Sequence, residues 1–221
     1  MARPRPVQSQ AMSLLPLLLV ATLQSPADRA IEAAVKSYAA IRTAKATFEQ
    51  TITNPLLGAT LPSRGEFEQS RPNRFAFRFT DPKGDVIICD GTYVWAYLPA
   101  SAPGRVNRAR CGGDGAGSLD LIGEFFTNPR DRYTIGDGGA ATVGERRAHV
   151  VLLTPKSKDA AFVRAKVWID PSSGSLLQFE AVEPNGLTRL VRILTFSPNV
   201  AVSARAFIFT VPRGVKVVDI R

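Results

Sequence analysis

The sequence predicts a mainly β protein, built on one antiparallel sheet that curls toward a barrel. From residue 46 onward, more than ten short segments alternate apolar and polar side chains with the period of two of a β-strand. Most of these segments are joined by short turns rich in Gly, Pro, Asn and Asp, which are typical of hairpins. Only two segments have helical spacing, and 45% of the 221 residues are apolar, so the sheet has material for a core.

Residues 1–27 have the composition of a secretory signal peptide. Arg3 and Arg5 form a short basic region, and a mainly apolar run follows it. Ser25 and Ala27 supply the small side chains of a cleavage site. The alternative is a membrane anchor, but the apolar run is shorter than the ~20 residues that a membrane helix needs. We therefore expect an exported, soluble protein with one domain over residues 28–221.

That domain should begin with a helix and continue in strands. Asp28 is placed to cap the helix, whose apolar face comprises Ile31, Ala34, Val35, Tyr38 and Ile41. Asp90 and Gly91 suit a type I′ hairpin turn. A second short helix is expected over residues 118–126. The predicted strands are 46–53, 65–69, 75–80, 85–89, 92–98, 105–110, 133–135, 147–153, 162–169, 176–182, 187–196, 207–210 and 215–219.

The chemistry available to this chain is limited by its one His and two Cys. A structural zinc site needs four ligands, more than these residues supply. A nucleophilic triad would have to use His149, which lies inside a predicted strand. Glu66 and Glu68 share one strand face and could mimic the carboxylate pair of a glycosidase, but exposed strand carboxylates are far commoner. We therefore expect that the protein is not an enzyme and that it binds neither a cofactor nor a metal ion.

The chain is basic, with 28 Lys and Arg against 19 Asp and Glu. The basic residues are scattered along the whole length and are not interleaved with aromatic residues in one segment. A nucleic-acid-binding protein more often gathers them on one surface. We therefore expect a solvated basic surface and no nucleic-acid partner.

Cys89 and Cys111 would meet an oxidising compartment after export. In a simple meander they end alternate strands, which places their Cα atoms about 9–10 Å apart. A disulfide needs less than about 7 Å, so a bond requires the intervening chain to fold back. The residues leave the bonded and the free state open.

Aromatic side chains share strand faces in two places. The first set is Phe75, Phe77 and Phe79, and the second is Tyr93, Trp95 and Tyr97. Such faces either close on a solid core or line an apolar pocket, and periodicity does not separate the two. Arg71 precedes the first set; its planar fork suits helix-end carbonyls or a carboxylate, although a surface arginine is the simpler interpretation.

Several segments in order resemble the LolA-type periplasmic lipoprotein carriers. They are residues 46–50 (ATFEQ), 71–77 (RPNRFAF), 86–91 (VIICDG), 94–99 (VWAYLP), 153–156 (LTPK), 179–183 (FEAVE) and 207–217 (FIFTVPRGVKV). The resemblance runs from about residue 28 to 219. It implies a strongly curved antiparallel sheet, an incomplete barrel, with a helical lid over a hydrophobic cavity.

The resemblance also implies a function and a set of site residues. The protein would be a monomer that receives acylated lipoproteins from an inner-membrane lipoprotein-releasing transporter and passes them to an outer-membrane lipoprotein receptor. Arg71 would hold the lid helices. The expected cavity walls are Phe48, Phe67, Phe75, Phe77, Phe79, Trp95 and Tyr97. The receptor of this fold is itself a lipoprotein, and no Cys lies near the expected cleavage site, which favours the carrier.

Two other functions stay open at this point. A periplasmic sensor of lipids or lipoproteins, or a receptor-like protein, could use the same half-barrel. An enzyme is disfavoured by the single His.

Overall fold

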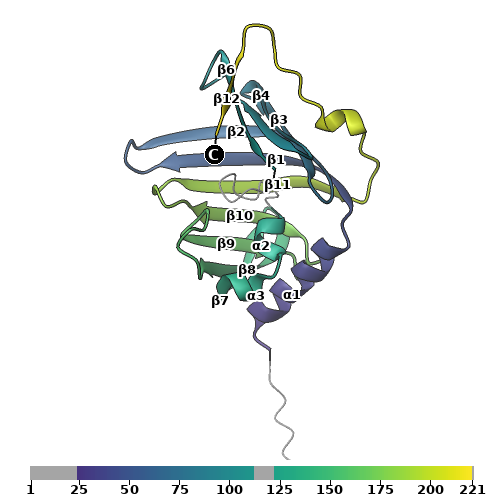
Figure 1. The fold of residues 1–221 in the computed structure, drawn as a ribbon. Helices are drawn as coiled ribbons and strands as arrows, with labels where there is room; N and C mark the ends of the chain where they lie inside the picture. The colour runs from purple at the N-terminus through teal and green to yellow at the C-terminus, as the bar shows by residue number, and fades with distance from the viewer. Residues whose placement is uncertain (1–23, 112–121, 221) are drawn as a thin grey trace, which may run out of the picture.

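The computed structural model describes residues 24–111 and 122–220, and its centre is one twelve-stranded sheet (Figure 1). The strands lie in the order β12-β6-β5-β4-β3-β2-β1-β11-β10-β9-β8-β7. β7 and β12 form the two edges, so the sheet bends strongly without closing. The predicted fold class, an incomplete barrel with helices over one face, is confirmed. The strands are β1 Thr43–Asn54, β2 Ala59–Ser70, β3 Arg74–Asp81, β4 Lys83–Asp90, β5 Tyr93–Tyr97, β6 Arg105–Arg110, β7 Tyr133–Val143, β8 Arg146–Pro155, β9 Arg164–Ile169, β10 Leu176–Val182, β11 Thr188–Pro198 and β12 Lys216–Asp219.

The sheet consists of two runs of hairpins joined in the middle. β1 pairs with β2 on one side and with β11 on the other, both antiparallel. Ala44, Ala46 and Phe48 alternate along β1 with more exposed residues and are buried. The side chains of this inward face meet the helices, so the curved sheet and its helices share one main core.

The C-terminal region differs from the predicted meander. β12 pairs with β6 in parallel, with Lys216 opposite Arg105. The strand expected over residues 207–210 is wrong, because a 3-10 helix, η1, spans Ala204–Phe207. The side chain of Ser203 caps this helix by accepting a hydrogen bond from the backbone N–H of Arg205. Phe207 packs on Ala76 and Ile88, so this segment covers the outer face of the sheet.

Helix α1 spans Pro26–Ala39 and buries Ile31, Ala34 and Tyr38 of the predicted apolar face. Its cap is Ser25, so the prediction of Asp28 as the cap is wrong. Ser25 Oγ accepts a hydrogen bond from the backbone N–H of Asp28 at 3.0 Å and donates to Asp28 Oδ2 at 2.7 Å. The two residues form a reciprocal cap, and Pro26 begins the helix because its missing N–H is unneeded there.

Two short helices lie against the same face of the sheet as α1 (Figure 1). α2 spans Gly123–Phe126 and α3 spans Pro129–Arg132. Residues 118–121 of the predicted second helix lie outside the described residues, as does most of the expected signal peptide. α3 was not predicted from the sequence.

The β4–β5 connection is not a type I′ turn. Gly91 has a φ of +106°, but Asp90 is not among the non-glycine residues with positive φ. Instead, Asp90 Oδ1 accepts hydrogen bonds from the backbone N–H groups of Thr92 and Tyr93, each at 2.8 Å. The carboxylate therefore organises the turn, as Asp side chains commonly do.

Candidate ligand-binding cavity

A cavity of about 420 Å³ lies between the concave face of the sheet and α2. This volume is within the roughly 300–1,000 Å³ of small-molecule sites. A smaller adjoining space of about 30 Å³ continues it inward, past Phe48 and Phe77. The apolar lining of the larger space comprises Phe48, Phe77, Phe79, Ile87, Val94, Ala96, Ala109, Phe125, Ala161, Phe162, Phe179, Ala181, Val191 and Ile220.

Most of the predicted aromatic residues lie at or near this cavity. Phe48, Phe77 and Phe79 line the larger space, and Phe67 lines the smaller one. Phe75 is buried in the core, where its ring lies 5.8 Å from the ring of Phe77. Phe48 also makes an edge contact with Phe77, at 5.8 Å between centroids. These aromatic residues form one connected group.

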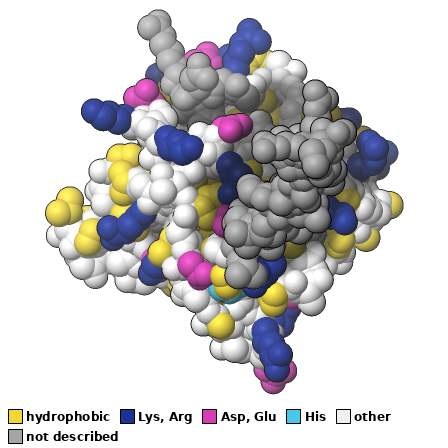
Figure 2. All heavy atoms as spheres, turned by 90° about the horizontal axis from the view of Figure 1, so that it is seen from below, with side chains coloured by type: hydrophobic (Ala, Val, Ile, Leu, Met, Phe, Trp, Pro, Cys, Tyr) yellow, Lys and Arg dark blue, Asp and Glu magenta, His cyan; other side chains and the backbone are white. Residues whose placement is uncertain are grey.

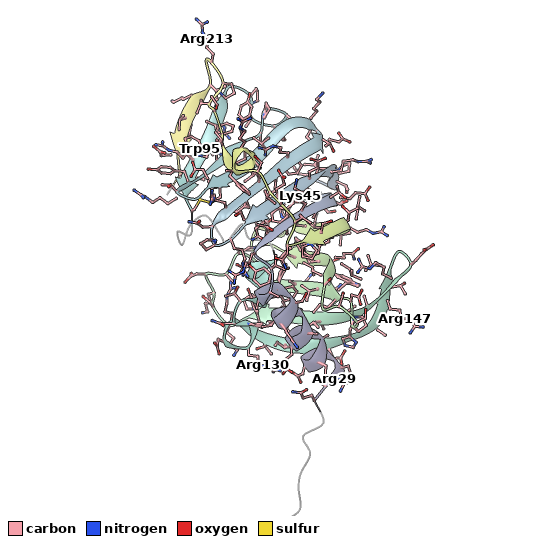
Figure 3. All side chains as sticks on the ribbon, turned by 90° about the vertical axis from the view of Figure 1, so that its right-hand side faces the viewer. Arg29, Lys45, Trp95, Arg130, Arg147 and Arg213 are labelled. Atoms are coloured by element: carbon pink, nitrogen blue, oxygen red, sulfur yellow. A yellow bond between two sulfur atoms is a disulfide. The ribbon has the colours of Figure 1, made fainter. Side chains whose placement is uncertain are left out.

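The prediction that Trp95 and Tyr97 line the cavity is wrong. Trp95 lies 5.5 Å and Tyr97 6.0 Å from Phe209, between ring centroids, on the outer face of the sheet. In Figure 3, Trp95 lies beside the C-terminal segment. Because side chains alternate along a strand, their neighbours Val94 and Ala96 face the cavity instead.

Arg71 contacts the C-terminal end of α1. Its Nη1 donates hydrogen bonds to the carbonyl oxygens of Tyr38 at 3.1 Å and of Ile41 at 3.2 Å. Tyr38 lies in the last turn of the helix and Ile41 just beyond it, where carbonyl groups lack the usual partners inside the helix. Arg71 therefore fixes the end of α1 to the turn between β2 and β3.

α2 covers the cavity through Phe125, whose ring lies 5.0 Å from that of Phe179. Its neighbour Glu124 accepts hydrogen bonds from Arg132 and, at 2.9 Å, from the hydroxyl of Tyr133. Partial burial, followed by the charge of Glu124, raises the pKa of Tyr133, so the hydroxyl remains a neutral donor. This network ties α2 to the start of β7.

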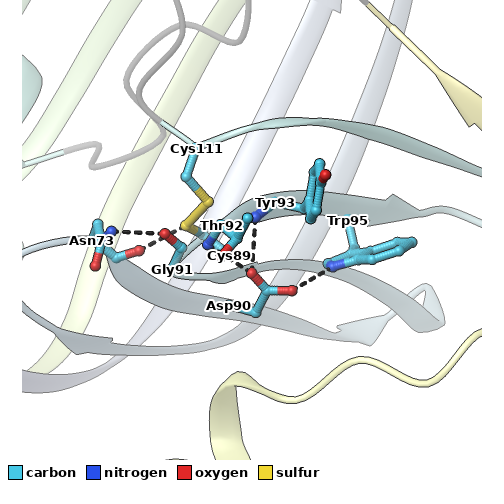
Figure 4. Close-up of a disulfide and its surroundings, with 8 residues drawn as sticks. All are labelled: Asn73, Cys89, Asp90, Gly91, Thr92, Tyr93, Trp95 and Cys111. Atoms are coloured by element: carbon cyan, nitrogen blue, oxygen red, sulfur yellow. Dashed lines mark hydrogen bonds between the residues drawn. A yellow bond between two sulfur atoms is a disulfide. The ribbon is translucent and has the colours of Figure 1, made fainter.

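Cys89 and Cys111 form a disulfide, with their Cα atoms 6.3 Å apart (Figure 4). The middle strand β5 begins only at Tyr93, so Cys111 meets the β4–β5 turn and not a full strand. The backbone N–H of Cys111 donates to the carbonyl oxygen of Thr92 at 2.9 Å. No full strand therefore separates Cys89 from Cys111, and their Cα atoms are closer than the two strand spacings of a flat meander would allow.

Sequence reasoning missed the polar part of the cavity wall. Gln50, Asn107, Glu124, Glu183 and Arg189 all line the larger space. One signal was available: Gln50 shares the apolar face of its strand with Ala46 and Phe48. A polar side chain at such a position needs a partner, because an unpaired buried amide is costly.

Basic side chains are spread over the surface. Figure 3 places Arg213 at one end of the molecule, Arg29 near the other and Arg147 at a side. On the face seen in Figure 2, Lys and Arg are likewise separated by apolar and uncharged groups. These views agree with the expected solvated basic surface.

His149 lies on β8, and its Nε2 is 2.8 Å from Asp137 Oδ1. Within residues 24–111 and 122–220, no group of three or more His, Cys, Asp or Glu could hold a metal ion.

Among the described helices, none has the length and apolar character to cross a membrane.

A curved, open sheet with an apolar cavity beneath helices defines a protein of the half-barrel class. A profile of the family described as outer membrane lipoprotein carrier protein LolA matches residues 39–108. The chain is 30% identical to an outer-membrane lipoprotein carrier protein of Serratia proteamaculans, over 80% of this chain and 81% of that protein. It is 31% identical to one of Haemophilus ducreyi, over 80% and 78% of the two chains. The chain belongs to the LolA family of outer-membrane lipoprotein carriers.

Solved structures share the fold at low identity. An uncharacterised conserved protein from Thermus thermophilus superposes with a TM-score of 0.54 at 12% identity, over 88% of this chain and 99% of that one. MucB superposes with a TM-score of 0.50 at 14% identity, over 83% and 62% of the two chains. These similarities concern the fold alone.

Proposed function

We propose that this protein carries lipoproteins through the periplasm. It binds the acyl chains of lipoproteins released from the inner membrane and delivers them to an outer-membrane acceptor. The observation that carries the proposal is the apolar cavity of about 420 Å³ inside the open sheet of a LolA-family chain. The partners would be the inner-membrane lipoprotein-releasing transporter, the acylated lipoproteins and the outer-membrane lipoprotein receptor.

The physical need for such a carrier follows from the cargo. Each methylene of an acyl chain gains about 0.8 kcal/mol on leaving water, so a free chain does not cross an aqueous compartment unshielded. Phe48, Phe77 and Phe179 offer it an apolar surface. Release requires a compensating gain in the empty carrier, and closure of α1 on Arg71 supplies one.

Release of the exported protein requires cleavage of the N-terminal segment, and the contacts at the start of α1 support one position for this cut. Ser25 caps α1, and Ala27 is only 2% exposed within the core. Cleavage after Ala27 would remove both residues from the helix. We therefore place the cut before Ser25, and N-terminal sequencing of the periplasmic protein tests this position.

The central experiment is recovery of the protein from the periplasm, followed by detection of acylated protein bound to it. Ala181→Trp fills the cavity, because Ala181 lines it and is 7% exposed. Glu180→Trp is the matched control. Glu180 lies on the same strand as Ala181 but points to the opposite face of the sheet, where its side chain forms an ion pair with Lys166 of β9. We expect acylated protein with the wild type and with Glu180→Trp, and little or none with Ala181→Trp. Equal recovery with both variants would contradict a role for the cavity.

Transfer separates a carrier from a lipoprotein sensor or a receptor-like protein of the same fold. A carrier loaded with acylated lipoprotein should pass it to outer-membrane vesicles that contain an acceptor. Retention of the cargo under these conditions would favour the sensor.

A further inference from the structure

Part of the cavity wall is a polar group of three side chains, Gln50, Glu183 and Arg189, here called the Arg189 cluster. Arg189 Nη1 donates to Gln50 Oε1 at 2.8 Å, and its Nη2 donates to Glu183 Oε1 at 3.0 Å. Gln50 Nε2 donates onward to Ser63 Oγ at 3.1 Å. All three members line the cavity.

Strand pairing holds the cluster in place. Gln50 lies opposite Val191, and Arg189 lies opposite Ile52, in the register of β1 with β11. Gln50 and Arg189 are therefore diagonal neighbours on the concave face. Glu183 directly follows β10, and its backbone N–H donates to the carbonyl oxygen of Leu187 at 2.8 Å in the turn before β11. The donors are thus fixed by the sheet before a ligand arrives.

Stability alone does not explain a polar cluster at this position. Gln50 is 8% exposed, and the side chains of Glu183 and Arg189 are 24% and 33% exposed. Apolar residues of similar size often serve stability as well as a partly buried ion pair does. They would also suit an acyl chain better. The cluster lies where the apolar interior of the cavity meets solvent. A ligand with a buried acyl chain would have its polar linking group at this position.

We propose that the Arg189 cluster binds the ester or amide carbonyl groups that link acyl chains to their cargo. This inference rests on the proposed function and names the chemical group that the cavity recognises. A guanidinium has more N–H donors than the two hydrogen bonds to Gln50 and Glu183 use. A carbonyl oxygen is a suitable acceptor for the remaining donors.

The charges of the cavity favour a neutral ligand group over an anionic one. Glu183 already pairs with Arg189, and Glu124 lines the same space. A carboxylate or phosphate near Arg189 would face the carboxylate of Glu183. An ester or amide carbonyl avoids this repulsion.

The cluster also sets the direction of the chain. The smaller apolar space lies next to Ala46, four residues before Gln50 on β1, or about 13 Å along the strand. Arg71 and the end of α1 lie beyond Ala46, at the start of the same strand: the backbone N–H of Arg71 donates to the carbonyl oxygen of Arg42. The methyl end of the chain therefore points toward α1, and its carbonyl group stays at the cluster.

The test compares methyl laurate, tridecane and laurate as competitors of a neutral, apolar fluorescent dye bound to the purified full-length mature protein. We expect the wild type to prefer the ester over the alkane by roughly fivefold to tenfold, the contribution of one net hydrogen bond. We also expect the ester to compete better than laurate. Arg189→Met should abolish the preference for the ester and bind tridecane at least as tightly as the wild type does, because Met adds apolar surface to the cavity wall.

Two further variants sharpen the test. Arg192→Met is the matched control: Arg192 lies on the same strand, and its side chain is outside the cavity. It should retain the wild-type preference. Glu183→Gln removes the counter-charge, so it should increase the affinity for laurate relative to the ester.

Four results would overturn the inference. An equal loss of ester and alkane binding in Arg189→Met assigns the residue a structural role. A wild-type preference for laurate assigns the cluster to anions. Equal binding of ester and alkane by a wild type that still co-purifies with acylated protein contradicts the cluster's role and leaves the proposed function standing. If no competitor binds and no acylated protein is recovered, both proposals fail.

Discussion

Arg71 lies 3.9 Å above the ring of Tyr38 and donates a hydrogen bond to the carbonyl oxygen of the same residue. One side chain thus holds both the backbone and the ring at the end of α1. Since α1 lies over the concave face, loosening this contact should open one end of the fold.

Arg71→Leu should keep the fold and the capacity to bind lipid but impair hand-off. Loss of two charged hydrogen bonds and a cation–π contact should lower the free energy of unfolding by about 1–3 kcal/mol. Amide hydrogen exchange should speed up at the end of α1. Denaturant unfolding, exchange mass spectrometry and a reconstituted transfer assay measure these effects.

Arg74→Leu is a suitable control for this substitution. Arg74 is exposed and lies 5.9 Å from the ring of Phe207, on the outer face. It should leave exchange in α1 unchanged. Normal transfer of acylated lipoprotein by the Arg71→Leu variant would contradict a role of Arg71 in release of the cargo.

Gly174→Ala should displace α1 from the other side. Gly174 lies in the β9–β10 turn with a φ of +69°, and an added Cβ would lie 2.4 Å from the carbonyl oxygen of Ala33. The clash is with helix backbone, so no flexible side chain can relieve it. We expect a loss of stability larger than the ~1 kcal/mol typical of Ala at a positive φ.

Gly104→Ala separates the two causes of this loss. Gly104 has a similar φ of +75°, but an added Cβ would meet nothing within 4 Å. Its thermal unfolding therefore reports the conformational strain alone. Similar melting temperatures for the two variants would show that α1 tolerates the added methyl group.

The strands and the inward face of α1 could be predicted from the sequence because they follow local rules. Alternation along a strand separates two faces, as it does for Phe48 and for Trp95. Alternation does not say which face is covered, or by what. The prediction that Trp95 and Tyr97 share a strand face is correct. That face, however, packs on Phe209, which is more than a hundred residues away in the sequence.

The candidate site depended even more on long-range pairing. The side chain of Arg71 suited a helix end or a carboxylate, and only the family resemblance selected the helix end, since no local pattern joins Arg71 to Tyr38. Arg189 and Gln50 meet because β1 pairs with β11, across 139 residues of chain. The disulfide likewise depends on a contact that local patterns do not show. The backbone of Cys111 pairs with Thr92 in the β4–β5 turn, and this pairing brings Cys111 close to Cys89.

The disulfide should stabilise the sheet against unfolding. It closes a loop with a sequence separation of 22, and chain entropy then predicts a contribution of about 3 kcal/mol. Replacing both cysteines by Ser should lower the free energy of unfolding by roughly that amount. Urea unfolding without reductant measures the difference.

Thiol counting provides the control for the disulfide. The denatured wild type should show no free thiol before reduction and two after it, because both cysteines are in the bond. Two free thiols in protein taken from the periplasm would refute the bond. Equal free energies of unfolding for the wild type and the double Ser variant would show that the disulfide does not stabilise the fold.

Asp170 should contribute stability that is lost only in strong acid. Partial burial acts to raise its pKa, but hydrogen bonds from Ser172, Arg146 and the backbone of Ser173 outweigh burial and lower it from 3.8 to about 2. A carboxyl whose folded-state pKa is depressed stabilises the fold above its unfolded pKa. Its contribution is therefore complete above about pH 4 and disappears as the pH falls toward 2.

Asp170→Asn tests this window through a difference between two proteins. Since the side chain of Arg146 is 50% exposed, solvent screens part of the ion pair, and we expect a loss of about 1–2 kcal/mol at pH 7. The difference from the wild type should shrink between pH 4 and pH 2, because the wild-type carboxyl becomes protonated there. Asp159→Asn, at an exposed position, is the control for replacing a carboxylate by an amide. Urea unfolding at a series of pH values measures both variants, and a difference for Asp170→Asn that stays constant down to pH 2 would contradict the depressed pKa.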